Sequence, residues 1–164
     1  MTESQELPCV DHSACCEIDR LEEGRCSIIP PRLPRIIVRG EKYRDNHGWE
    51  GKISDGVVFW HYLSGPGDLA VVELKGGKVD RDTTEQLQGG ANLAELLSKV
   101  EKARFGVVLA ANQFHPETRK VIDRSRVIFR GREYPIAVVR CRTALENAPP
   151  WRTQRVTRRR DSPN

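Results

Sequence analysis

Runs of apolar residues mark three buried strands in the middle of the chain. The segments GVVFWHYLS (56–64), LAVVELK (69–75) and FGVVLAAN (105–112) are rich in β-branched, aromatic and other apolar residues, a composition that favours strands. The turn-forming segment SGPGD lies between the first two, so we predict a β-hairpin. The second run is apolar on both faces until Glu73, as expected of a central strand that is covered on both sides.

Helical periodicity follows the hairpin. We predict a helix over residues 83–102, opened by the capping-box-like pair Asp82 and Glu85, with a buried stripe formed by Leu93, Leu96, Leu97 and Val100. A shorter helix is expected at 115–124, with Pro116 in its first turn. Further strands are expected at 35–39, 127–129 and 136–140. This order predicts an α/β fold with a central mixed β-sheet flanked by helices.

The ends of the chain differ from the middle in charge. Residues 1–26 carry seven acids and two arginines, so they hold −5 while the remainder of a chain with net charge +4 holds +9. We expect an acidic, cysteine-bearing arm over 1–34, with a short helix at 13–24 and a proline-rich linker at 27–34. Residues 41–51 are polar and turn-rich. The core is then expected at 35–145 and a basic tail at 146–164. A basic body and tail favour a polyanionic partner, most often nucleic acid, although a solvated tail has the same composition.

Glu73 and Lys75 are two residues apart at the end of a buried strand and therefore project to the same side. Carboxylate oxygens suit Mg²⁺, which needs one or two of them together with waters and phosphate. A hairpin turn centred on Gly65 and Pro66 places Asp55 opposite residue 76, within cross-strand reach of Glu73. Asp68 lies five residues from Glu73 and faces the other way. The alternative is a structural Glu–Lys pair at a strand end.

Asp55, followed by Glu73-Leu74-Lys75 and a helix that carries Gln86, resembles the PD-(D/E)xK nuclease superfamily, which includes restriction endonucleases and Holliday junction resolvases. The resemblance implies a restriction endonuclease-like core in which Asp55 and Glu73 bind Mg²⁺ or Mn²⁺. It also implies that Lys75 positions or activates the attacking water and that Gln86 helps to orient the site. Ser54 stands where the motif has its proline.

Gln86 shares a helix face with Gly90, Leu93 and Leu97, the face turned to the sheet, whereas Gln88 is expected to face solvent. An inward glutamine needs a hydrogen-bond partner, because burying an unpaired amide costs about 1–3 kcal/mol. The partner is either a nearby backbone group or the site itself, that is, the carboxylates, Lys75 or the scissile phosphate. Exposed cations that could contact nucleic-acid phosphates are Lys78, Arg81 and Arg119, and plain surface charge explains each of them equally well.

The cysteines gather in the N-terminal arm. Cys9, His12, Cys15 and Cys26 have a spacing that a structural Zn²⁺ could use. The chain has no second Cys-x-x-Cys pair, so we favour free thiols in the arm, or thiols buried at an interface, over zinc. Cys141 is expected to be a small core residue. His47, His61 and His115 show no partner spacing.

Three functions are consistent with these patterns. The first is a metal-dependent nuclease that hydrolyses phosphodiester bonds, of DNA rather than RNA, within a defence or repair complex. The second is a catalytically inactive nucleic-acid-binding or assembly subunit with the same fold. The third is a redox or zinc-binding regulator centred on the N-terminal cysteines. A homodimer or a larger protein complex is expected for the nuclease.

The chain contains no apolar run near the roughly 20 residues of a membrane span, and its N-terminus shows no signal-peptide pattern. We therefore expect no membrane association, a cytoplasmic location and reduced thiols.

Overall fold

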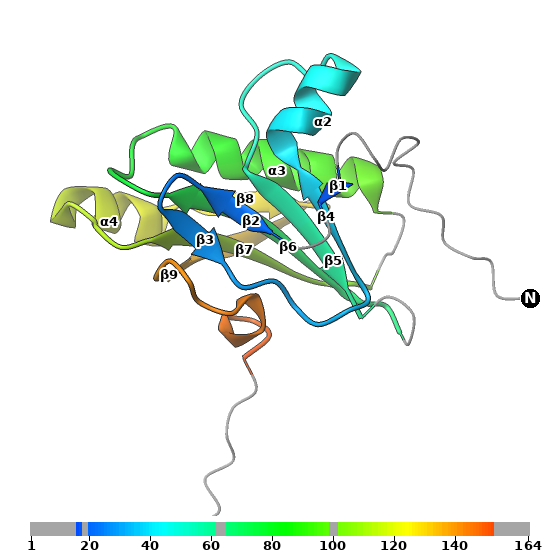
Figure 1. The fold of residues 1–164 in the computed structure, drawn as a ribbon. Helices are drawn as coiled ribbons and strands as arrows, with labels where there is room; N and C mark the ends of the chain where they lie inside the picture. Colours follow the sequence, from blue (N-terminus) through cyan, green and yellow to red (C-terminus); the bar gives the residue numbers. More distant parts are fainter. Residues whose placement is uncertain (1–15, 18–19, 62–64, 99–101, 153–164) are drawn as a thin grey trace, which may run out of the picture.

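A seven-stranded sheet forms the centre of the protein. The computed structural model describes residues 16–17, 20–61, 65–98 and 102–152. Across the sheet the strands lie in the order β1 (Cys16–Glu17), β4 (Arg35–Arg39), β5 (Gly56–Trp60), β6 (Asp68–Lys75), β7 (Arg104–Ala111), β9 (Arg132–Val139) and β8 (Arg126–Phe129). The pairs β6–β7 and β7–β9 are parallel and the others antiparallel. The predicted α/β class with a mixed sheet is confirmed (Figure 1).

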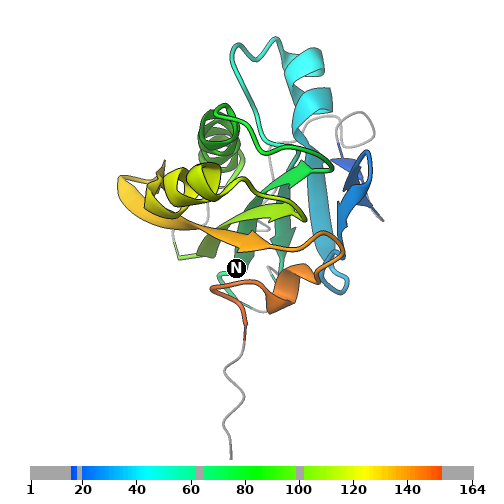
Figure 2. The ribbon, with the colours of Figure 1, turned by 90° about the vertical axis from the view of Figure 1, so that its left-hand side faces the viewer.

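Helices cover one face of the sheet and a hairpin covers the other (Figure 2). Helices α2 (Gly40–His47), α3 (Thr83–Leu97) and α4 (Pro116–Arg124) contribute to one apolar core. The opposite core is closed by the hairpin of β2 (Leu21–Glu23) and β3 (Cys26–Ile28) and by the short helix η1 (Leu145–Asn147). The prediction that helices flank the sheet is therefore correct for one face only, because the other face is covered mainly by a β-hairpin.

Glycines bring α3 close to the sheet. A Cβ atom at Gly90 would overlap the side chains of Ser54 and Val71, and one at Gly89 would overlap the Lys52 backbone. Each glycine in a helix interior costs about 1 kcal/mol relative to alanine, and the close approach explains why these two are present. As a result, the first turns of α3 lie beside the segment that carries Asp55.

The N-terminal expectations were wrong wherever the structure describes the chain. Part of the helix predicted at 13–24 is strand β2, and Gly24, with φ +55°, turns the chain into β3. The 27–34 segment is not a free linker, because Ile28 is 3% exposed. Leu21 and Cys26 are also core residues, so a boundary at residue 34 does not separate an arm from the core.

Cys26 and Cys141 form a disulfide across 115 residues of sequence. This pairing contradicts the expectation of reduced thiols for these two residues, and it removes Cys26 from the predicted zinc ligands. Cys9, His12 and Cys15 lie outside the described residues. Cysteine spacing alone did not indicate the pair, because its two members meet only through the tertiary fold.

Three local predictions also need correction. Residues 41–51 are not all turn, since they include most of α2, which ends at Gly48 in a left-handed conformation (φ +64°). Helix α3 ends at Leu97, and Leu96 is 56% exposed rather than part of the buried stripe, whose last predicted member, Val100, lies outside the described residues. Asp82 and Glu85 form no capping box: both pair with Lys52.

Gln88 does not simply face solvent. Its side-chain amide donates to the carbonyl of Ile128 and accepts from the N–H of the same residue, both at 2.9 Å. Ile128 belongs to β8, the last strand of the sheet. The glutamine therefore occupies backbone groups that an edge strand would otherwise leave open.

The C-terminal region stays packed beyond the expected boundary at residue 146. Ala148 and Trp151 are buried, and the Trp151 ring makes an edge contact with Trp60 at 4.8 Å between centroids. Residues 153–164 lie outside the described part of the chain. Among the described residues, no helix combines the length and the apolar character that crossing a membrane requires.

Candidate active site

The β5–β6 hairpin joins two carboxylates by reciprocal hydrogen bonds. Gly56 pairs with Val72, which places Asp55 opposite Glu73 rather than opposite residue 76 as expected. The Asp55 N–H donates to Glu73 Oε2 at 3.1 Å, and the Leu74 N–H donates to Asp55 Oδ2 at 2.7 Å. Each acid is therefore held by the backbone of the strand that carries the other.

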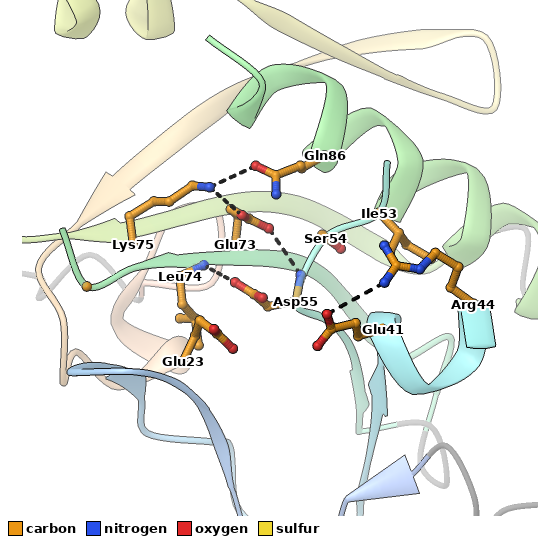
Figure 3. A pocket seen from close by; sticks show the side chains of 11 residues that line it. Glu23, Glu41, Arg44, Ile53, Ser54, Asp55, Glu73, Leu74, Lys75 and Gln86 are labelled. Carbon is orange, nitrogen blue, oxygen red and sulfur yellow. Dashed lines mark hydrogen bonds and ion pairs between the residues drawn. The ribbon is translucent and has the colours of Figure 1, made fainter. Parts of the chain in front are cut away.

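Lys75 and Gln86 complete this cluster (Figure 3). Lys75 Nζ lies 3.0 Å from Glu73 Oε1 and donates to Gln86 Oε1 at 2.8 Å. The prediction that Glu73 and Lys75 project together is confirmed, and so is the prediction that Gln86 faces the sheet. The partner of Gln86 is the lysine rather than nearby backbone. Asp80 also approaches the Lys75 ammonium, at 3.7 Å.

Burial sets the charge state of the two acids. Burial raises the pKa of Glu73 to about 7, and the nearby Asp55 carboxylate acts in the same direction against the Lys75 ammonium. Burial also raises the pKa of Asp55 to about 6, although the hydrogen bond from Leu74 opposes it. Burial acts to lower the pKa of Lys75, but the Glu73 contact and the surrounding carboxylates outweigh it and the pKa is raised. The cluster thus holds one charged lysine beside two carboxyl groups, and this single positive charge cannot balance both of them when they are ionised.

A polar cavity of about 300 Å³ opens at this cluster. Its walls include side chains that sequence reasoning missed, namely Glu23, Glu41, Arg44 and Ser54. Glu23 comes from β2 and its charge adds to the raised pKa of Asp55. Arg44 pairs with Glu41 at 3.5 Å on α2. No sequence signal identified Glu23, Glu41 or Arg44, because β2 and α2 lie well before the hairpin in the chain and were predicted in other conformations, whereas Ser54 was noted only at the place of the motif's proline.

The predicted nucleic-acid contacts do not line the cavity. Lys78 and Arg81 are exposed in the segment that joins β6 to α3, directly after the cavity residue Gly76. Arg119 lies on α4, where it pairs with Asp123 at 2.9 Å and stacks over Phe114. The structure therefore brings together Asp55, Glu73, Lys75 and Gln86 but leaves the three cations on the surrounding surface.

The acid pair fits a hard divalent cation better than zinc. Within the described ranges, no group of three His, Cys, Asp or Glu side chains is arranged to hold a metal, whereas structural zinc takes four such ligands. Mg²⁺ binds through one or two carboxylates and keeps several waters. Asp55 and Glu73 could supply two, and burial raises the pKa of each, so a cation beside them would favour their charged forms.

Comparison of the chain with protein-family models, with curated proteins and with solved structures found no match. The geometry of the site is therefore the basis for any functional conclusion.

Proposed function

We propose that the protein is a metal-dependent nuclease with a restriction endonuclease-like core, which hydrolyses phosphodiester bonds of nucleic acid and prefers DNA to RNA. The observation that carries the proposal is the convergence of Asp55, Glu73, Lys75 and Gln86 on one polar cavity. The element order supports the same core: the β5–β6 hairpin is followed by α3 and then by the parallel strand β7.

Each side chain has a distinct role in this proposal. Asp55 and Glu73 would hold Mg²⁺ or Mn²⁺, which supplies charge stabilisation to phosphoryl oxygens and lowers the pKa of a bound water. Lys75, which is 13% exposed at its side chain, would orient the attacking water and neutralise charge that develops on the phosphate. Gln86 accepts one of the three ammonium hydrogens of Lys75 and so fixes the direction of the other two.

Substrate binding would use the surface around the cavity. Lys78 and Arg81 follow β6, the strand that carries Glu73 and Lys75. Their contacts with phosphates would add affinity for nucleic acid without recognising its base sequence. Arg119 would contribute only after exchanging its Asp123 partner for a phosphate. We further propose that the nuclease acts as a homodimer or within a larger complex, since one such site cuts a single strand.

We also propose that the protein is located in the cytoplasm. The Cys26–Cys141 disulfide is the observation against that location, because cytosolic thiols are kept reduced. Thiol titration of protein isolated from its native cells would decide the point: two protected thiols per chain in cytosolic protein would mean that this bond persists there.

The proposal is tested by incubating the purified protein with plasmid DNA, single-stranded DNA and RNA in Mg²⁺, in Mn²⁺ and in EDTA. We expect cleavage that requires metal and that falls at least about 100-fold in Glu73→Gln and in Lys75→Ala. Matched controls are Glu117→Gln and Lys120→Ala, which remove an exposed acid and an exposed lysine on α4 and should retain full activity.

Nucleic-acid binding without cleavage in any metal would overturn the nuclease and favour the non-catalytic subunit. Cleavage that survives Lys75→Ala unchanged would show that the activity does not arise at this site.

A further inference from the structure

A second charged cluster lies at the amino end of β6. Asp68, the first residue of the strand, is 6% exposed. His61 Nδ1 lies 2.8 Å from Asp68 Oδ2, and Arg104 Nε donates to Asp68 Oδ1 at 2.9 Å. His61 thus has a partner that its sequence context did not indicate. Both carboxylate oxygens are occupied, so this acid presents little negative charge to the outside.

The side chains of His61 and Arg104 are held in defined directions. His61 directly follows β5 and has φ +55°, a region that non-glycine residues seldom enter. Both the backbone and the side chain of Arg104 are held in place. Its backbone N–H donates to the carbonyl of Gly67 at 3.1 Å, and its side chain binds Asp68. Such residues are preorganised, and less conformational entropy is lost when they bind a ligand.

These groups line a groove of about 510 Å³ on the surface of the protein. The groove is bounded by the turn at Gly65, Pro66 and Gly67 and by Lys102 and Arg104. Lys102 is exposed and makes no ion pair with the part of the chain that the structure describes. Among the residues that the structure describes, Arg104 contacts Asp68 through Nε alone, so its two terminal nitrogens can act as donors.

The charge balance of the groove favours an anion. Among the described residues that line the groove, Lys102 and Arg104 are cationic and His61 adds donor capacity, against one buried carboxylate, that of Asp68. Arginine and lysine donors at one site suit phosphate oxygens, which accept several charge-assisted hydrogen bonds at once. The volume lies in the range of small-ligand sites.

We propose that the groove lined by His61, Lys102 and Arg104 is a phosphate-binding site. The phosphate belongs either to a small phosphate-bearing compound or to a polynucleotide backbone. The proposal does not rest on nuclease activity, because Asp68 and Glu73 are five residues apart in β6 and so face opposite sides of the sheet.

The test is a titration of the full chain in EDTA and low salt, first with inorganic phosphate and then with a short single-stranded oligonucleotide, followed by calorimetry and by NMR of backbone amides. We expect phosphate to shift the amide signals of Gly67 and Arg104 and not that of Glu73. Lys102→Ala should weaken phosphate binding about 10-fold, since one charge-assisted contact is lost. The control Lys120→Ala should bind as the unmodified protein does.

The two phosphate sources give different results in Lys102→Ala. Parallel loss of oligonucleotide and phosphate affinity identifies a polynucleotide, and loss of phosphate affinity alone identifies a small phosphate compound. The proposal is overturned if phosphate shifts no groove amide, or if Lys102→Ala binds phosphate as well as Lys120→Ala does. Cleavage assays of Lys102→Ala are read separately, because a failure of the nuclease leaves these binding results unaffected.

Discussion

The two ends of strand β6 carry buried carboxylates in opposite charge environments. At the carboxyl end, the Lys75 ammonium contacts Glu73 at 3.0 Å and also acts electrostatically on Asp55. At the amino end, Asp68 alone is held between Arg104 and His61. Around the first end the carboxylates outnumber the cations Lys75 and Arg44, whereas around the second the cations Arg104 and Lys102 outnumber the carboxylate of Asp68.

This difference determines which ligands each end can attract. A buried acid pair with too little countercharge favours its own protonation or the arrival of a cation, as the raised pKa values of Glu73 and Asp55 indicate. A buried acid with surplus cations orients them for an anion instead. The same residue type, at two ends of one strand, thus supports metal binding at one end and phosphate binding at the other.

The ends also differ in how they are held together. Near the carboxyl end, Cys141 Sγ lies 3.9 Å from the Lys75 carbonyl oxygen, and its disulfide to Cys26 anchors the β2–β3 hairpin that carries Glu23. Near the amino end, the cross-links around Asp68 are ion pairs and hydrogen bonds. Covalent and ionic cross-links respond to different perturbations.

The largest expected effect is the loss of the covalent cross-link. The double variant Cys26→Ala/Cys141→Ala should have a free energy of unfolding about 4 kcal/mol lower than that of the unmodified protein, since the disulfide closes a loop of 115 residues. Denaturant unfolding followed by tryptophan fluorescence measures it. Reduction of the unmodified protein with a dithiol should reproduce the loss, and an unchanged midpoint after reduction would contradict the role given to the disulfide.

The next effect concerns the ion pairs at the amino end. Asp68→Asn should lower the free energy of unfolding by about 2 kcal/mol, because the buried carboxylate loses its charged contacts with Arg104 and His61, whose own side chains are half-exposed and stay solvated. Metal-dependent cleavage by the folded variant should persist. The control is Asp123→Asn, which breaks the exposed pair with Arg119 and should cost less than about 1 kcal/mol; equal losses in the two variants would refute the contrast.

The acid pair at the carboxyl end predicts a dependence of stability on pH. Folding raises both pKa values, to about 6 for Asp55 and about 7 for Glu73. A raised folded-state pKa contributes stability that is complete below the unfolded pKa and is lost as pH rises through the folded one. Between pH 5 and pH 8 the metal-free protein should therefore lose about 2 to 4 kcal/mol of unfolding free energy, the upper figure holding if the two acids titrate independently.

Glu73→Gln is the control for this pH dependence. It should flatten the profile and be more stable than the unmodified protein at pH 8, the opposite sign to Asp68→Asn. Mg²⁺ should raise the melting temperature of the unmodified protein at pH 8 but not that of Glu73→Gln. If the profile stays as steep in Glu73→Gln, the pKa of Glu73 is not the cause.

The sequence predicted the parts of the fold that depend on local patterns. The apolar runs of β5, β6 and β7 and the presence of α3 and α4 were predicted correctly, because strand alternation and helical spacing are properties of consecutive residues. The grouping of Asp55, Glu73 and Lys75 followed from a single hairpin and needed no distant contact. Even there, the register differed by three positions, because it depends on the shape of a turn that composition does not specify.

Tertiary structure alone decided the rest. The Cys26–Cys141 disulfide, the hairpin that brings Glu23 to the cavity and the Arg104–Asp68 pair all join residues that are far apart in the chain. Such contacts leave no periodic signal, because one charged or sulfur-bearing side chain looks the same in sequence whether its partner is solvent or another element. The sequence alone determined which strands were buried and where one acid–lysine cluster would form, and only the packing of the hairpin, the helices and the sheet determined what surrounds each end of β6.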